Sequence, residues 1–155
     1  MGGRPAPGRQ GRALLDPRPG RPNSIAPSVK PLANMCPIIA LRDGEPSLAL
    51  GAAGGRTIFP ALVQIVSSLF DRGLSLEDAF HAARLDASAA TVKINAKADP
   101  AVAATVASRH TIEIVEDTLY PVNFAVPSGV MRDPDGAGYV GMAHPTSPWA
   151  AVAAA

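Results

Sequence analysis

Two adjacent glycines, Gly54 and Gly55, are the residues of this sequence best suited to take part in chemistry. They end a run of small residues, GAAGG at 51–55, and because glycine has no Cβ, a ligand can approach their backbone N–H groups closely. Pro60 suits the first turn of a following helix, whose N-terminal end carries a partial positive charge. Such donors can bind an anion or stabilise an oxyanion. The same glycine pair is also typical of a plain, tight connection between a strand and a helix.

A β-hairpin is predicted to carry the chain to these glycines. Residues 35–41 and 46–50 are apolar runs of strand length. The dipeptide Asp43-Gly44 between them tolerates the positive φ angles of a tight hairpin turn. We therefore expect the two runs to pair.

Helical patterns follow the glycines. Apolar residues three and four apart predict a helix that starts near Pro60, ends at Gly73 and buries one face: Leu62, Ile65, Val66, Leu69 and Phe70. Ser75 with Asp78 resembles a capping box for a second helix over 76–84. On this helix the face predicted to be buried consists of Leu76, Ala79, Phe80 and Ala83, with His81 in solvent.

The rest of the chain is predicted to contain further strands and one more helix. Asp99 and Pro100 mark the start of a tightly packed helix through Ala107. Strands are expected over 91–95, 111–115, 121–126 with 130–131, and 139–143, with a hairpin turn at 133–136. This order of elements indicates an α+β fold rather than a regular βαβ alternation.

Two motifs at a fixed spacing give the sequence a family resemblance. The segment 31–37 reads PLANMCP, and GAAGG follows at 51–55. In this order they resemble the small-subunit core of the γ-glutamyltranspeptidase (gamma-glutamyltransferase) family of N-terminal-nucleophile hydrolases, from about residue 23 to residue 149. The resemblance implies part of a layered αββα sandwich, cut short on its N-terminal side. The implied activity is hydrolysis or transfer of γ-glutamyl or related acyl amides, such as glutathione-type substrates.

The resemblance also assigns roles to four residues. Gly54 and Gly55 would donate their N–H groups to the oxyanion that forms during acyl transfer. Ala33 and Asn34 stand where the family has two serines whose hydroxyls hold the α-carboxylate of the γ-glutamyl group. Ala33 has no side-chain donor, whereas the Asn34 amide can donate to a carboxylate or cap the first turn of the strand. An altered substrate pocket is therefore expected, and strict γ-glutamyl selectivity does not follow.

The nucleophile implied by the family is not among these motifs. It is a threonine freed by self-cleavage, whose α-amine acts as its base, in a Thr-Thr-His type segment upstream of PLANMCP. Residues 1–22 contain neither Thr nor Ser. We therefore expect the chain to be inactive alone and to need the upstream or large-subunit part of the same enzyme. A non-catalytic binding or scaffold module that keeps the fold is an alternative, and so is a truncated reading frame that does not fold alone.

Two further residues are expected to be structural. Arg84 stands where the family has an arginine that closes the second helix, and a structural ion pair or a clamp on a carbonyl is predicted there. Cys36 has no base near it in the sequence and is predicted to be a buried, inert thiol.

The first 22 residues differ from residues 23–155. They hold five Arg, five Gly, five Pro and one Asp, and we interpret them as a disordered or artefactual tail ahead of one domain.

Since the whole chain has a net charge of +1 and the tail carries most of the excess positive charge, the domain is mildly acidic and no nucleic-acid partner is expected. No secretory signal and no apolar run of about 18 residues is present. Membrane insertion is therefore not expected, and a cytoplasmic location is assumed by default.

No cofactor is expected. The histidines His81, His110 and His144 show no HExxH spacing, and the single cysteine excludes a CxxC pair. The sequence contains no GxxxxGK[ST] loop and no GxGxxG loop for phosphates, and no GxSxG nucleophile elbow. A small-molecule acyl amide is the substrate that the resemblance implies.

Overall fold

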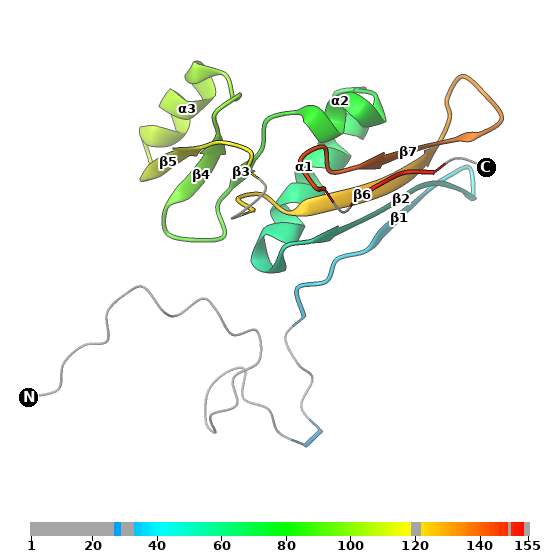
Figure 1. Ribbon diagram of the computed structural model, residues 1–155, viewed down its shortest axis with the longest axis horizontal. Helices are drawn as coiled ribbons and strands as arrows, with labels where there is room; N and C mark the ends of the chain where they lie inside the picture. The colour runs from blue at the N-terminus through cyan, green and yellow to red at the C-terminus, as the bar shows by residue number, and fades with distance from the viewer. Residues whose placement is uncertain (1–26, 29–32, 119–121, 149, 154–155) are drawn as a thin grey trace, which may run out of the picture. The chain divides into compact units, whose positions relative to one another are not determined.

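The computed structural model describes residues 27–28, 33–118, 122–148 and 150–153 and is shown in Figure 1. The chain divides into two compact units, residues 1–34 and residues 35–155. Every helix and strand formed by the described residues lies in the second unit. Of the first unit the structure describes residues 27–28 and 33–34, so the predicted tail over 1–22 lies outside the described residues.

The predicted hairpin is confirmed and begins an antiparallel sheet. Strand β1 (Ile38–Arg42) pairs with β2 (Glu45–Ala53), and Asp43 (φ 54°) and Gly44 (φ 84°) make the turn. Strand β2 pairs on its other side with β6 (Val126–Arg132), which forms the second predicted hairpin with β7 (Tyr139–Ala143). The strand order is β1-β2-β6-β7.

A smaller sheet lies at the left of Figure 1. Its strands are β3 (Leu85–Asp86), β4 (Val92–Asn95) and β5 (Ile112–Val115), in the order β3-β4-β5. Strand β4 runs antiparallel to β3 and parallel to β5. The parallel pair requires a crossover, and helix α3 (Pro100–Ala107) provides it. This mixture of antiparallel hairpins with one crossover confirms the α+β class.

Helix α3 has the predicted ends but not the predicted packing. The Asp99 carboxylate accepts from Ala101 N–H at 2.8 Å, and Pro100 occupies the first turn. Every residue of α3 is described, and none of them is buried. The expectation of a tightly packed helix was therefore wrong. The small Ala and Val side chains of α3 lie mainly against β5, and no layer among the described residues covers the outer side of the helix.

Helices α1 (Ile58–Phe70) and α2 (Leu76–His81) cover one face of the larger sheet. Gly73 (φ 67°) ends the turn after α1. The capping box of α2 is confirmed, since Ser75 Oγ accepts from Asp78 N–H at 3.0 Å and donates to Asp78 Oδ2 at 2.7 Å. The buried core lies between these helices and the sheet: Leu48, Leu50, Ile58, Ala61, Leu62, Ile65, Leu69, Leu76, Ala79, Phe80 and Ala125.

Two predicted core residues are exposed, and Val66 is partly buried. Phe70 is 48% exposed, because it is the last residue of α1 and the helix face has left the sheet there. Ala83 is exposed, because α2 ends at His81 and the extended conformation of Ala82 (ψ 142°) carries Ala83 off the helix. His81 is exposed, as predicted. Cys36 is half-buried and packs against the core.

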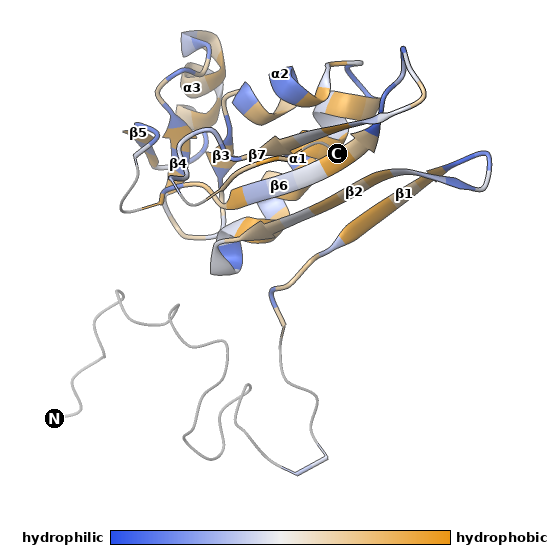
Figure 2. Ribbon diagram, turned by 45° about the vertical axis from the view of Figure 1, so that its right-hand side comes forward, coloured by the Kyte–Doolittle hydropathy of each residue, from blue (hydrophilic) through white to orange (hydrophobic). Residues whose placement is uncertain are grey.

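The opposite face of the larger sheet is apolar and only partly covered, since residues 151–153 lie along it and Val152 lies over Gly141. Figure 2 shows hydrophobic colour along β1, where Ile39 is 71% and Leu41 is 62% exposed. A groove of about 830 Å³ crosses this face. Its floor includes small residues of the strands: Ala49, Gly51, Ser128, Gly141 and Ala143.

Removing the Leu62 side chain tests the position of the core. Leu62 is fully buried (0% exposed) and Val63, its neighbour on α1, is 45% exposed. We expect Leu62→Ala to lower the free energy of unfolding by about 2–5 kcal/mol, and Val63→Ala to change it by less than about 0.5 kcal/mol. Urea denaturation followed by circular dichroism measures both. Equal effects of the two substitutions would show that α1 does not bury this face.

Candidate functional site

The glycine loop is shorter than the sequence motif that contains it. Strand β2 continues through Ala53, and its residues Gly51 and Ala53 pair with Ser128 and Val126 of β6. Only Gly54 remains between β2 and the short 3₁₀ helix η1 (Gly55–Thr57), which leads directly into α1. The pairing of β2 with β6 therefore fixes the position of the backbone before the glycine pair, and α1 fixes it after the pair.

Both glycines have backbone conformations that other residues rarely adopt. Gly54 has φ 150° and Gly55 has φ 64°. A Cβ on Gly54 would lie 2.9 Å from Ala125 Cα and 2.7 Å from Thr57 Oγ1, closer than real Cβ contacts. Glycine at position 54 is thus required both by its conformation and by the chain that passes beside it.

The carbonyl groups of the pair are used internally, and the N–H groups are not. Gly54 O accepts from Thr57 N–H at 3.3 Å and from Thr57 Oγ1 at 3.0 Å. Gly55 O accepts from Ile58 N–H. None of the hydrogen bonds found among the described residues has the N–H of Gly54 or Gly55 as its donor. The loop can therefore offer two backbone donors to a ligand.

The electrostatic surroundings of the loop favour a negative charge. The loop precedes the N-terminal end of α1, a helix of 13 residues. The described first turns of η1 and α1 contain no acidic residue. Arg56, which is exposed, follows Gly55 directly. No carboxylate of these turns competes with an anion for the donors, and the helix dipole adds to their attraction.

The segment 84–88 supports the loop from the neighbouring sheet. Arg56 Nη1 donates to Ser88 O at 3.3 Å. Gln64 of α1 bonds to both backbone groups of Leu85, with Nε2 donating to the carbonyl at 2.8 Å and Oε1 accepting from the N–H at 2.9 Å. Neither role is predictable from the sequence, because no local pattern shows that a helix amide faces the edge of a distant strand.

The two other predicted site residues belong to the first unit, which is described by itself. Ala33 is exposed and Asn34 is half-buried, and neither lies in a helix or strand. The structure therefore joins Gly54 and Gly55 in one loop, and leaves the substrate role of Ala33 and Asn34 a prediction. Residues 31–32 of the PLANMCP motif lie outside the described residues.

Arg84 makes the predicted clamp on a carbonyl. Its side chain is buried, and Nη1 donates to Phe80 O at 2.9 Å.

Among the described residues, no group of three His, Cys, Asp or Glu side chains is placed to hold a metal ion. Within the same residues, no helix has the length and apolar character needed to cross a membrane.

Comparison with known proteins gives consistent results. A family model described as gamma-glutamyltranspeptidase matches residues 6–154, a range that starts inside the predicted tail. Acylase ACY 1 proenzyme from Pseudomonas sp. (strain SE83) is 35% identical over 95 residues, which are 61% of this chain and 17% of the relative. A glutathione hydrolase proenzyme from Pseudomonas aeruginosa is 40% identical over 63 residues, 41% of this chain and 11% of the relative. The chain thus spans less than a fifth of the length of these curated relatives.

A solved structure extends the match to the fold. A mutant gamma-glutamyltranspeptidase from Pseudomonas nitroreducens superposes with a TM-score of 0.70 and 23% sequence identity, over 92% of this chain and 78% of that chain. At this identity the superposition shows the fold alone.

Replacing Gly54 tests whether the loop conformation is as tight as described. We expect Gly54→Ala to lower the free energy of unfolding by about 1–3 kcal/mol, since alanine would need a strained φ and would contact Ala125 and Thr57. Gly138→Ala is the control, because a Cβ there meets nothing within 4 Å. Thermal unfolding of the two variants measures the difference. A Gly54→Ala variant as stable as Gly138→Ala would contradict the described loop.

Proposed function

The chain belongs to the γ-glutamyltranspeptidase family, whose model covers residues 6–154, and from this premise we propose that it supplies the oxyanion loop of an amide hydrolase or acyltransferase. The fold agrees with the family, since its solved neighbours are N-terminal-nucleophile hydrolases. The observation that carries the proposal is the pair of uncommitted N–H groups, on Gly54 and Gly55, ahead of α1.

The proposed role concerns one step of acyl transfer. A threonine hydroxyl attacks the amide carbonyl, and the carbonyl oxygen becomes an oxyanion. The N–H groups of Gly54 and Gly55 would donate to this oxygen from about 3 Å and lower the energy of the transition state. The amine then leaves, and water or a second amine takes the acyl group from the threonine. This sequence contains no Thr-Thr-His segment, so the proposal assigns the threonine to another part of the enzyme.

The partly covered face of the larger sheet supports a partner of this kind. In an αββα sandwich a second sheet packs about 10 Å from the first. Ile39 and Leu41 are exposed on this face, and the groove beside them has a floor of small residues. We propose that the upstream or large-subunit part of the enzyme contributes the second sheet, and that its larger apolar side chains fill the groove.

The acyl group is proposed to be γ-glutamyl or a related acyl amide. The curated relatives are called an acylase and a glutathione hydrolase, two names that differ in the acyl group. Ala33 and Asn34 are proposed to face the α-carboxylate end of the substrate. With one amide in place of two hydroxyls, this pocket would hold a carboxylate less tightly than a serine pair would.

Removing a single backbone donor tests the oxyanion role. The chain is produced together with the polypeptide encoded directly upstream, and release of p-nitroaniline from γ-glutamyl p-nitroanilide is followed. Replacing Gly54 by glycolate makes a backbone ester, which deletes the N–H and keeps a Cβ-free residue. We expect kcat to fall by about 10²–10³-fold, whereas the same replacement at Gly138 should leave kcat unchanged.

Two outcomes would contradict the oxyanion role. An ester at position 54 that leaves kcat unchanged would exclude its N–H as a donor. A folded complex that releases no amine from any acyl anilide would favour the non-catalytic binding or scaffold module.

Restoring the serine pair tests the substrate pocket. We expect Ala33→Ser with Asn34→Ser to raise the ratio of kcat/KM for γ-glutamyl anilide over butyryl anilide about tenfold or more, because each hydroxyl can donate to the α-carboxylate and a hydrogen bond to a charged group is worth about 1.5–3 kcal/mol. Butyryl anilide is the matched control, since it lacks that carboxylate. An unchanged ratio would show that these two positions do not contact the substrate.

A further inference from the structure

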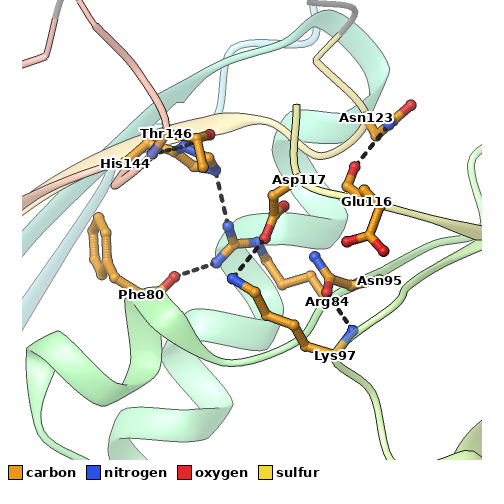
Figure 3. Close-up of polar contacts among 9 residues, drawn as sticks. All are labelled: Phe80, Arg84, Asn95, Lys97, Glu116, Asp117, Asn123, His144 and Thr146. Carbon is orange, nitrogen blue, oxygen red and sulfur yellow. Dashed lines mark hydrogen bonds and ion pairs between the residues drawn. The ribbon is translucent and has the colours of Figure 1, made fainter. Parts of the chain in front are cut away.

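A buried polar contact joins the two sheets, and the proposed function does not use it. Arg84 precedes β3 in the smaller sheet, and His144 follows β7 in the larger one. Their side chains meet although they lie 60 residues apart in sequence, with Arg84 Nη2 3.1 Å from His144 Nε2. Each residue is only 5% exposed. Figure 3 shows the guanidinium between the imidazole and the Phe80 carbonyl.

The chemistry of the two groups fixes where the imidazole proton lies. A guanidinium stays charged and can only donate, so His144 Nε2 must accept with its lone pair. The neutral imidazole then carries its proton on Nδ1. Thr146 Oγ1 lies 2.9 Å from Nδ1, where it can accept that proton, and the backbone N–H of Thr146 also points at Nδ1, at 3.3 Å. Both ring nitrogens are therefore occupied, and neither leaves room for a second proton.

We propose that His144 is a pH-sensitive latch, which holds the two sheets together while its imidazole is neutral and releases them when it is protonated. A proton on Nε2 would point at the N–H of Arg84 and abolish the hydrogen bond. It would also place two cations at the same 3.1 Å contact in surroundings that exclude water. The imidazolium can avoid this cost only by leaving the guanidinium.

The other charged groups near His144 do not reverse this conclusion. His81 on α2 and Lys97 after β4 add positive charge, and Asp117 after β5 adds negative charge. The Asp117 carboxylate is already paired with Lys97 Nζ at 3.2 Å. Burial, and then the charge of Arg84, lower the pKa of His144 below its ordinary value, with Asp117 opposing them.

Arg84 has few other partners to hold it in place. Its Nε is buried and has no hydrogen-bond partner among the described residues. Burial lowers the pKa of Arg84, and the negative charge of Asp117 raises it in part. The guanidinium is therefore held by two hydrogen-bond partners, the Phe80 carbonyl and His144, and by the attraction of Asp117.

The latch holds the segment that supports the glycine loop. Arg84 begins the segment 84–88, in which Leu85 bonds to Gln64 of α1 and the Ser88 carbonyl accepts from Arg56. Release of Arg84 therefore loosens the smaller sheet at the end that contacts α1.

The direction of the pH effect follows from the lowered pKa of His144. The unfolded or opened chain takes up a proton near pH 6.5, the ordinary value for histidine, whereas the latched state resists protonation. The contribution of the latch is fully present above about pH 6.5 and is lost as the pH falls through the lower pKa of the folded state.

Hydrogen exchange measured by mass spectrometry tests the latch on the full chain. Protection of β4 and β5 amides is compared at pH 7.5 and 5.5, after correction for the intrinsic exchange rate at each pH. We expect protection to fall at pH 5.5 by up to about tenfold, because this pH lies about one unit below the ordinary pKa of histidine. His144→Gln keeps an acceptor for Arg84 but cannot take a proton, so its protection should be equal at both pH values.

A matched control and a second measurement complete the test. His81→Gln removes an exposed histidine of α2 and should behave as the unsubstituted chain does. ¹⁵N NMR of the imidazoles should show His144 neutral at pH 7.5 with its proton on Nδ1. If His144→Gln does not fold, this NMR measurement decides the test. Equal protection of the unsubstituted chain at both pH values, a fall in His144→Gln as large as in that chain, or a proton on Nε2 at pH 7.5 would each overturn the proposal.

Discussion

The close passage of Gly54 beside Ala125 is the contact on which the loop geometry depends. Ala125 directly precedes β6, and β6 pairs with β2 as far as Ala53, so the ladder brings the two backbones together where β2 ends. A Cβ at position 54 would meet Ala125 Cα at 2.9 Å. The sheet, the loop and the start of α1 therefore form one rigid unit. Their common requirement is a residue without a side chain at the point where they meet.

Features set by residues close together in the sequence were predicted well. The Asp43-Gly44 turn, the Ser75 cap and the Asp99-Pro100 helix start depend on a few neighbouring residues, and the structure has all three. Features set by distant residues were not predicted. The contact of Arg84 with His144 spans 60 positions, and the single-residue loop after β2 reflects pairing with β6. The exposure of α3 likewise depends on which layers surround it, and no helix pattern contains that information.

In the described part of the second unit, the two faces of the larger sheet differ in how well they are covered. The helix-covered face of the larger sheet has a core with well-buried side chains such as Leu62 and Ile65. On the other face the described residues provide only the segment 151–153 as cover, and this face presents both apolar side chains and a groove. A chain that spans less than a fifth of its curated relatives is expected to show such an interface, because a fold divided between segments has a core divided between them.

The position of strand β1 affects how the isolated chain associates with other copies of itself. It ends the strand order of the larger sheet, it carries the exposed side chains Ile39 and Leu41, and its outer backbone groups have no neighbouring strand among the described residues. Edges of this kind pair readily with identical edges of other molecules. Under the proposed function, docking of the partner and self-association through β1 therefore compete, and the concentrations of the two chains set the balance.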